Sequence, residues 1–434
     1  MALIHTMSKE CLKSELDIFR VPMTQTSIEQ SYYVEVPPLT ALNQTSPVEF
    51  HVAGCTDYYM DLNNSYLFIR AKITKADGSN LTANDSVGFV NYAASSIFSQ
   101  LDVTLGDRII SHSSNSYPYR CIIECLTNYN REALDIQFGN ALFSMDTAGH
   151  MDVAVVDGNN AGLKKRGGYT ANSRTIEMTS AIHSDIFHQD RLLINGIDLK
   201  LKFTRSKNSF CLMNATAEEY KVVLENVSLF IKKVGISPPV RLAHAKALQQ
   251  ANARYPIDRV VVKTYSLTAG SRVAGIDHLF LGKIPEKVVI GFVNDIAFNG
   301  SYAHNPFNFH HYDIEFFCLY IDGQQFPAKP YQGRLERGGG AREYQNLYAS
   351  TGCYLKNQAM AIDRDQFISG YTLYCFNLNA DDANGGHMSL ARNGNARVEL
   401  RFANPLPHTI NMICYSVETS IIEISSRRQV LTEF

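Results

Sequence analysis

The amino-acid sequence predicts an all-β protein in which two similar antiparallel modules follow one another along the chain. Three observations support this fold class: a repeated hairpin, further features that recur in the same order, and a length that suits two domains. The 434 residues exceed what one ordinary hydrophobic core covers, whereas two domains of roughly 200 residues lie within the usual size range. We therefore expect a doubled β module with a few short helices.

The repeated hairpin is the clearest sign of the duplication. Residues 101–110 alternate apolar and polar side chains around a Gly-Asp turn at Gly106, and residues 314–326 do the same around an Asp-Gly turn at Gly323. Such alternation is typical of strands with one buried face, and glycine beside aspartate favours a tight hairpin turn. The two glycines lie 217 residues apart, which is half of the chain. Self-similarity at this offset indicates a repeated structural unit.

Three further features follow each hairpin in the same order: a helical stretch with one apolar face, a five-residue alternating strand, and a longer strand-like run. In the first half these are residues 117–129, 199–203 and 220–234, and in the second half residues 344–348, 398–402 and 409–424. The helical stretches show the i, i+3, i+4 recurrence of a one-faced helix. The offset between matching features shrinks along the chain, as unequal loops would cause.

Residues 1–40 differ in character and are expected to form an N-terminal arm. Leu12, Leu16 and Phe19 have the spacing of one helical face, which Pro22 would end. Such an arm is disordered unless something ties it down, so two interpretations stay open: a frayed terminus, and an arm that binds a neighbour. The candidate assembly residues in the arm are Leu12, Leu16, Ile18 and Phe19.

The first module is expected at residues 41–235, and the second, with a short C-terminal tail, at residues 257–434. Residues 236–256 between them are predicted to form a packed helical connector. Two prolines at Pro238 open a stretch of helical apolar spacing, and Pro256 ends it.

Residues 146–174 are rich in Asn, Asp and Gly and are interpreted as a long exposed loop. The basic triplet Lys164-Lys165-Arg166 within it has two interpretations, a phosphate-binding or nuclear-import patch and a solvated loop tip. Three charges are too few to favour the first.

Composition argues against several classes of function. A net charge of −2 argues against a protein that wraps nucleic acid through its phosphates. No apolar run resembles a signal peptide or reaches transmembrane length, and the nine cysteines lack paired metal-binding spacing, so a reduced intracellular chain is expected. Cys121 and Cys125 are interpreted as small apolar core residues.

Charged residues make up only 19% while Tyr and Phe number 23 each, which favours extensive surface burial in protein contacts.

The only cluster of histidines in the sequence is a weak metal candidate. It comprises His304, His310 and His311 together with Asp313. Adjacent histidines would point to opposite faces of a strand, so they do not readily converge on one ion. A half-buried strand edge is the preferred interpretation.

The glycine loop at Gly338–Gly340 has the composition of an anion cradle, because Arg334, Arg337 and Arg342 flank it. It lacks the glycine, lysine and hydroxyl spacing of a phosphate-binding loop and does not directly follow a strand. A phosphate site is therefore weakly indicated, whereas a flexible connector needs no special explanation. We therefore expect no enzymatic activity, no cofactor and no metal site.

Nine runs of residues, spread in order over the whole chain, carry a family resemblance. One of them is Asn-Pro-Phe-Asn-Phe at 305–309. The other runs are residues 14–29, 66–78, 117–120, 183–187, 205–213, 242–248, 299–302 and 320–325. Together they resemble the hexon-like major capsid proteins of animal Polinton/Maverick elements and adintoviruses.

The resemblance implies a double jelly roll, which is two eight-stranded antiparallel β sandwiches side by side, and assembly as a homotrimer. Six near-equivalent rolls would give the trimer a pseudo-hexagonal outline that tiles an icosahedral shell, with heterologous contacts that close into a ring. The implied partners are the chain itself, a single jelly-roll penton protein and other minor capsid proteins. Sequence-specific nucleic-acid binding and a transmembrane segment are not expected.

The implied location is the virion capsid, after synthesis in the cytoplasm or nucleus of the host cell and without secretion through the signal-peptide route. The alternative from another class is a lectin-like or receptor-binding β sandwich that uses residues 146–174 as its reading surface. A metal-dependent β-sandwich enzyme is a further alternative, which the arrangement of the histidines disfavours.

Overall fold

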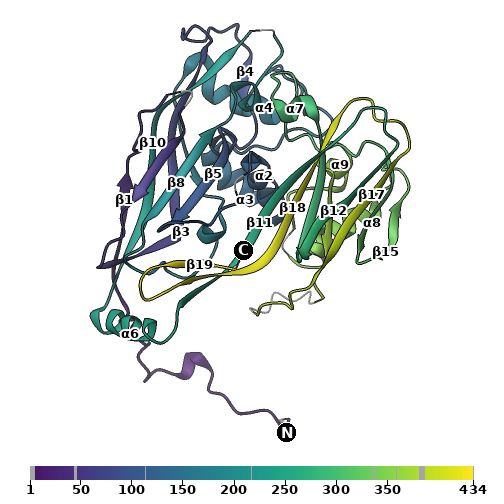
Figure 1. Ribbon diagram of the computed structural model, residues 1–434. Helices are drawn as coiled ribbons and strands as arrows, with labels where there is room; N and C mark the ends of the chain where they lie inside the picture. Colours follow the sequence, from purple (N-terminus) through teal and green to yellow (C-terminus); the bar gives the residue numbers. More distant parts are fainter. Residues whose placement is uncertain are drawn as a thin grey trace.

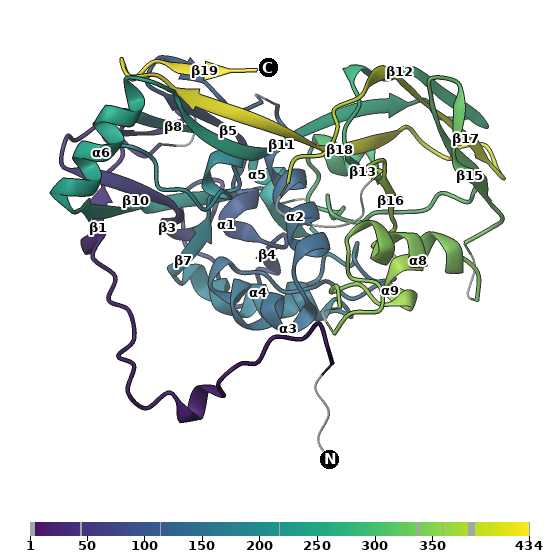
Figure 2. The same ribbon diagram turned by 90° about the horizontal axis from the view of Figure 1, so that it is seen from below.

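The computed structural model of the protein describes residues 5–43, 46–112, 114–216, 218–335, 338–357, 359–380 and 387–433. Arg337, which the sequence places beside the glycine loop, lies outside the described residues. Two antiparallel β sandwiches stand side by side, and a separate N-terminal segment leaves the body next to a short helix (Figures 1 and 2). We refer to residues 28–236 as the first roll and to residues 253–424 as the second roll.

The first roll consists of two four-stranded sheets. One sheet has the order β1 (Ile28–Val36), β10 (Tyr220–Ile236), β3 (Tyr58–Lys75) and β7 (Ile176–Ala181). The other sheet has the order β2 (Val48–Val52), β8 (Leu199–Arg205), β5 (Phe98–Leu105) and β6 (Arg108–Ile109). A small additional pair joins β4 (Val87–Phe89) to β9 (Leu212–Asn214).

The second roll repeats this arrangement. One sheet has the order β11 (Ala253–Leu267), β18 (Ile410–Ile424), β13 (Lys287–Asn294) and β16 (Leu373–Asn377), with β19 (Val430–Thr432) paired to the end of β18. The other sheet has the order β12 (Val273–Lys283), β17 (Asn393–Phe402), β14 (Ile314–Ile321) and β15 (Gln324–Gln332).

The duplication extends to every main strand. When the eight main strands of each roll are numbered in chain order, both rolls have one sheet ordered 1-8-3-6 and another ordered 2-7-4-5. This order is that of an eight-stranded jelly roll built from Greek keys. The predicted all-β double jelly roll is therefore confirmed.

The hairpins and strands that predicted the duplication form as expected. Leu105 pairs with Arg108 across the first turn, and Ile321 pairs with Gln324 across the second. The predicted strands at 199–203, 220–234, 398–402 and 409–424 correspond to β8, β10, β17 and β18. In β8 and β17 the alternating apolar side chains are buried on one face, as the pattern requires.

The helices are short and lie mainly in the connections between strands. They are α1 (Ala93–Ser96), α2 (Tyr117–Asn128), α3 (Arg131–Ile136), α4 (Ala161–Thr170), α5 (Asn208–Cys211), α6 (Pro238–Leu248), α7 (Asp295–Asn299), α8 (Ala341–Ser350) and α9 (Arg364–Ile368). The 3-10 turns in the described residues are η1 (Ser14–Leu16), η2 (Phe138–Ala141), η3 (Ala171–Ser173) and η4 (Asp185–Phe187). The helical stretches expected at 117–129 and 344–348 are α2 and α8.

The interpretation of residues 146–174 as a long exposed loop is wrong. Asn160 caps α4, because its side chain accepts a hydrogen bond from the Leu163 amide, and the helix buries Leu163 completely. Arg166, the last residue of the basic triplet, is also completely buried, whereas its neighbours Lys164 and Lys165 are exposed. The polar and glycine-rich composition of this segment therefore conceals a packed helix.

Two elements lie across the expected domain boundaries. β1 lies within residues 1–40 and pairs with β10 along the edge of the first sheet, so this sheet includes residues that the sequence boundaries leave to the arm. α6 ends at Leu248, and β11 begins at Ala253 inside the range expected for the helical connector. Alternating burial of Tyr255 and Ile257 in the pairing with β18 explains why this part of the chain is strand rather than helix.

The junction between the rolls and candidate assembly surfaces

The two rolls meet through α2, which packs between β5 of its own roll and β11 and β18 of the second roll. Every residue of α2 from Tyr117 to Thr127 is buried, although the helix contains Arg120 and Glu124. Two charged side chains buried in one short helix require partners, because an unpaired buried charge is very costly. The junction supplies these partners from both rolls.

A buried ion-pair network surrounds Arg120. Its Nε donates to Oε1 of Glu124 at 2.9 Å, and its Nη2 donates to Oδ1 of Asp185 at 2.7 Å. The second roll completes the network, because the Val260 amide donates to Asp185 at 3.3 Å and the Tyr415 hydroxyl donates to Glu124 at 3.4 Å. Charges from the first roll are thus satisfied partly by groups of the second.

The charges in this network shift one another's ionisation. Burial alone would raise the pKa of Glu124, but Arg120 and the neighbouring histidines outweigh it and hold this pKa well below its usual range. Burial raises the pKa of Asp185, and Arg120 offsets the effect only in part. Glu124 therefore remains ionised in the interior. This is possible because the Arg120 guanidinium, which it shares with Asp185, stabilises the negative charge.

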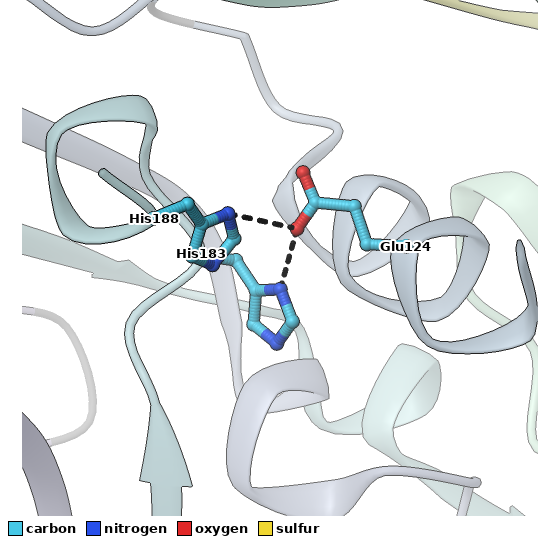
Figure 3. A group of neighbouring side chains, drawn as sticks. All are labelled: Glu124, His183 and His188. Carbon is cyan, nitrogen blue, oxygen red and sulfur yellow. Dashed lines mark hydrogen bonds and ion pairs between the residues drawn. The ribbon is translucent and has the colours of Figure 1, made fainter. Parts of the chain in front are cut away.

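Two histidines extend the network on the other side of Glu124 (Figure 3). His183 Nδ1 lies 2.6 Å from Glu124 Oε2, and His188 Nδ1 lies 4.0 Å from the same oxygen. His183 Nε2 also contacts the Tyr92 hydroxyl at 2.7 Å. A neutral His183 with its proton on Nδ1 satisfies both contacts, so both of its ring nitrogens are used within the protein.

Glu124, His183 and His188 form a group of potential metal ligands in the described part of the chain, with ligand atoms within 4.8 Å of one another. Their geometry fits hydrogen bonding better than coordination. Two ligand atoms on one tetrahedral zinc ion with bonds near 2.0 Å would lie roughly 3.3 Å apart, farther than the 2.6 Å between His183 and Glu124. The Arg120 guanidinium on the same carboxylate further disfavours a cation there.

Sequence reasoning missed this cluster. Glu124 lies on α2, whereas His183 and His188 flank η4, so only the fold brings them together. The one local signal was the i, i+4 pair Arg120 and Glu124 on a helix that is otherwise apolar. Cys121 and Cys125 on the same helix are fully buried, which confirms their interpretation as core residues.

A second buried ion pair anchors the far side of the junction. The Arg166 guanidinium donates to the carboxylate of Asp146 at 2.6 Å and to the carbonyl oxygens of Phe89 and Ser144. Asn305 of the second roll donates to the other oxygen of Asp146 at 2.8 Å. The Tyr371 hydroxyl donates to the Asp146 carbonyl at 2.9 Å. Residues expected on an exposed loop therefore hold the two rolls together.

Aromatic packing joins the two networks. The ring of Tyr119 from α2 stacks on Phe298 of the second roll with centroids 5.5 Å apart, and Phe307 and Phe309 pack against its edges. The buried rings of Tyr119, Phe307 and Phe309 belong to one continuous apolar cluster that includes both rolls. The junction therefore resembles a domain interior more than a contact between separate domains.

Each roll has one sheet that contains its first strand. These two sheets have the same strand order but differ in burial. In the second roll, every residue of β13 from Val288 to Val293 and of β18 from Ile410 to Ser416 is buried. In the first roll, β3 alternates, with Leu67 and Ile69 buried and Phe68 between them only partly buried. The first sheet of the first roll therefore has an outer face that this chain leaves open.

The candidate residues of the arm are exposed. The side chains of Leu12, Leu16, Ile18 and Phe19 have exposed fractions of 66%, 64%, 75% and 93%. The helical face expected of them is wrong in this structure, because the only regular element there is the three-residue turn η1. An apolar hollow of about 550 Å³ lies under α6, and Ser27 and Ile28 at the root of the arm form part of its rim.

The histidine cluster predicted from the sequence does not form a site. His310 lies 3.8 Å from Asp152 of the first roll, and His311 lies 3.4 Å from Asp313. The expected half-buried strand edge is also wrong, because residues 310–313 form a turn before β14 in which Tyr312 and Asp313 have positive φ angles. The two histidines thus have separate carboxylate partners.

The glycine loop does not form an anion cradle in its described part. Arg342 donates to the carbonyl oxygens of Lys329 and Pro330. Arg364 donates hydrogen bonds to the carbonyls of Gly338 and Gly339. The loop thus binds a cationic side chain through its carbonyl oxygens and does not present its amides to an anion. The connector interpretation therefore fits best.

Among solved structures, the double jelly roll is shared over the full length of the chain. A chain of the Sputnik virophage matches with a TM-score of 0.65 and 15% identity, covering 98% of this chain and 93% of that one. The Faustovirus major capsid protein matches with a TM-score of 0.59 and 9% identity, covering 94% and 92%. The mavirus major capsid protein matches with a TM-score of 0.56 and 8% identity, covering 100% and 97%.

A relative is also found at the level of sequence. An uncharacterised protein of Caenorhabditis elegans is 24% identical over 399 residues, which are 89% of this chain and 93% of the relative. No family model matches the chain. Among the described residues, no helix has the length and apolar character needed to cross a membrane.

Proposed function

We propose that this chain is a major capsid protein that forms pseudo-hexagonal homotrimers, which tile an icosahedral shell. The observation that carries the proposal is the strand-for-strand duplication, in a fold that the Faustovirus and mavirus major capsid proteins share over nearly their whole length. Two rolls of equal topology in one chain produce six rolls in a trimer, so a threefold oligomer acquires an approximately sixfold outline. Such an outline is suited to tiling a surface.

The measurement of oligomer mass tests this proposal. Purified full-length protein should have three times the chain mass of 48.5 kDa by light scattering or native mass spectrometry. Electron micrographs should show three-cornered or six-cornered particles, and shells at higher concentration. A monomer at micromolar concentration would contradict the proposal.

Several partners belong to the same proposal. A shell tiled by trimers needs a different protein at its fivefold vertices, which we assign to a single jelly-roll penton protein, and other minor capsid proteins are expected beneath the shell. The location is the virion capsid after synthesis in the host cell. No catalytic role is proposed, because the buried charged residues Arg120, Glu124, Asp146 and Arg166 are used to join the rolls.

We assign the chain to the capsid proteins of animal Polinton/Maverick elements and adintoviruses. The relative from Caenorhabditis elegans supports this assignment, because an animal encodes a chain of nearly the same extent. Genes for other capsid proteins should then lie beside this one in its source genome. An isolated gene among ordinary host genes would contradict the assignment.

The arm is proposed to bind neighbouring trimers or minor proteins. Its apolar side chains Leu12, Leu16, Ile18 and Phe19 are more than half exposed in the single chain, which is unfavourable unless a partner covers them. The lectin-like alternative loses its support, because residues 146–174, its proposed reading surface, contain a helix and the junction residues Asp146 and Arg166.

A further inference from the structure

The helix that connects the two rolls, α6, is poorly covered by the rest of the chain. Of its eleven residues only Leu248 is buried, although most of them are apolar or proline. Leu242 has an exposed fraction of 59%. A helix of this length is marginal in water by itself and is normally stabilised by packing of an apolar face. The exposure of α6 therefore indicates that a further segment covers it.

The side of α6 that faces the body lines the apolar hollow of about 550 Å³, which we call the α6 hollow. Val240, Ala247 and Leu248 are among its residues from the helix, and Tyr59, Ile194 and Tyr255 are among those from the rest of the chain. An apolar cavity of about 150 Å³ holds one benzene ring, so the α6 hollow has room for several apolar side chains. Apolar surface that faces water favours a ligand that removes it from water.

The α6 hollow also has a positively charged edge. Arg191 and Arg254 both line it, and Arg191 donates to the Arg254 carbonyl at 2.6 Å. Arg254 pairs with Glu423 at 2.9 Å, whereas Arg191 forms no ion pair with any described residue. A segment that combines apolar side chains with a carboxylate would therefore be complementary to the hollow.

The arm contains a segment of this kind. Residues 15–19, Glu-Leu-Asp-Ile-Phe, place two carboxylates among three apolar side chains. The three apolar side chains are more than half exposed in the single chain. Both carboxylates form only exposed ion pairs within the arm, which contribute little and are readily exchanged. A segment without a cover and a hollow without an occupant thus match in chemistry.

The arm and the α6 hollow lie at the same end of the molecule (Figure 1). The Ser237 amide, at the start of α6, donates to the Ser27 carbonyl at 2.9 Å, so the arm leaves the body directly beside the helix. None of residues 5–23 is buried or lines the hollow of its own chain. From Phe19 to Ser27 the chain advances eight residues, which span at most about 29 Å, roughly the diameter of a small domain. Residues 15–19 can therefore reach an adjacent copy.

We propose that the α6 hollow of one copy binds residues 15–19 of the arm of a copy in a neighbouring trimer. This inference rests on the proposed role of the arm and names the surface that receives it. Apolar side chains of the segment enter the hollow, and its carboxylates lie at the edge beside Arg191. Because every copy has its arm and its hollow at the same end, the contact can repeat from trimer to trimer across a shell.

Disulfide trapping in shells of the full-length protein tests the occupant. One variant carries Arg20→Cys, which keeps the apolar side chains of the arm, and the other carries Ala247→Cys. Both also carry Cys11→Ser, which removes the exposed native cysteine. Oxidised shells from an equal mixture should give linked dimers on a non-reducing denaturing gel. Shells of either variant alone, and isolated trimers of the mixture, should give only the background from the native cysteines.

A blocking substitution measures what the contact contributes to assembly. Ala247→Trp fills the α6 hollow with an indole ring, and the control Ala245→Trp places the same ring on the opposite side of the helix, where Ala245 is also exposed. Ala247→Trp should keep the trimeric mass but lower the shell yield by about tenfold or more, because burial of one apolar side chain changes affinity by at least this order. Ala245→Trp should assemble as wild type does. If Ala247→Trp lowers the melting temperature, Arg191→Glu replaces it, since Arg191 is exposed.

The outcomes separate the docking site from the function. Wild-type protein that forms neither trimers nor shells overturns the proposed function and this inference together. Shells without the linked dimer, or equal shell yields for the two tryptophan variants, overturn the docking site alone and leave the capsid function standing. Linked dimers in isolated trimers overturn the contact between trimers. A chain that carries both cysteines and closes only on itself assigns the hollow to its own arm and also overturns the inference.

Discussion

The Tyr415 hydroxyl of the second roll lies 3.4 Å from Oε1 of Glu124 in the first roll, deep within the junction between the rolls. Glu124 also accepts from Arg120, so one buried carboxylate connects a cation of its own roll with a hydroxyl of the other. Buried charges of this kind add little net stability as pairs, but removing one partner leaves the other unsatisfied. The rolls are therefore expected to unfold together.

Glu124→Gln should destabilise the whole chain. The substitution removes the charge that partners Arg120, and breaking a buried ion pair typically costs about 3–5 kcal/mol in the free energy of unfolding. Denaturation by urea, followed by circular dichroism and by tyrosine fluorescence, should show one transition at lower urea concentration. Glu132→Gln on the exposed surface of α3 is the matched control and should change little. Equal midpoints for the two variants would contradict the assigned role of Glu124.

The effect of Glu124→Gln should depend on pH. Burial would raise the pKa of Glu124, but Arg120 and the histidines hold it well below its ordinary value of 4.5. The unfolded chain therefore binds this proton at higher pH than the folded chain, so the ionised carboxylate stabilises the fold above about pH 4.5 and loses this effect as pH falls further.

Melting temperatures of wild type and Glu124→Gln measured across this range test the linkage. Their difference should stay constant from about pH 7 to about pH 5 and should shrink at lower pH. We compare wild type with the variant rather than following the stability of wild type alone. Burial raises the pKa of Asp185, so protonation of this residue stabilises the fold as pH falls, which is opposite to the effect of Glu124. A difference that is independent of pH would argue against an ionised Glu124.

Arg166→Lys should weaken the second anchor of the junction although it keeps the charge. The guanidinium donates to the Phe89 and Ser144 carbonyls and to Asp146, and an ammonium group on a different stem cannot reproduce this planar arrangement. Acceptors left without a donor typically cost about 1–3 kcal/mol in unfolding free energy. Lys165→Arg, the reverse exchange at the exposed neighbouring residue, should leave the urea midpoint unchanged. Similar midpoints for both variants would refute the anchoring role of Arg166.

Alanine substitutions at two glycines of α4 should have opposite effects on stability. A Cβ at Gly162 would lie 2.6 Å from the Met145 carbonyl oxygen, whereas a Cβ at Gly168 would meet no atom within 4 Å. Gly162→Ala should therefore destabilise the protein by about 1–3 kcal/mol through overpacking. Gly168→Ala should stabilise it by about 0.5–1 kcal/mol, because alanine is the better helix former. Thermal melting of both variants tests the packing of α4, and a loss of stability at Gly168 would contradict it.

Much of the fold could be predicted from the sequence because local patterns and the fold agree along most strands. From Leu199 to Phe203, apolar residues alternate with lysines and buried positions alternate with exposed ones. Gly106 and Gly323 occupy tight hairpin turns, where glycine is favoured. Where an element is covered on both sides, the pattern carries less information. The continuous apolar run of β13 indicates burial but does not identify the covering residues, such as Phe309, which lies against Gly291 and comes from a separate connection.

The junction could not be predicted for a related reason. Arg166 stands in a basic triplet beside glycines and has the local appearance of an exposed residue, yet its partners Phe89 and Asp146 are distant in sequence. His183 and Glu124 lie 59 residues apart. Local propensity reports what a side chain prefers alone, whereas a buried charge depends on partners that only the tertiary fold provides.

Removal of the arm should separate trimer formation from shell formation. The deletion should end at residue 24, because the Gln25 side chain accepts from the Ile28 amide at 2.7 Å and β1 pairs with β10 from Ile28 onward. The shortened chain should keep the trimeric mass and melting temperature of wild type, since none of the residues from His5 to Met23 is buried. Shell yield in electron micrographs should fall strongly, because Leu12, Leu16, Ile18 and Phe19 are lost.

The matched control replaces only Lys9 and Lys13 by alanine, which keeps the apolar side chains and should preserve assembly. Normal shells from the shortened chain would remove the proposed role of the arm, whereas loss of the trimer would assign the arm to the trimer itself.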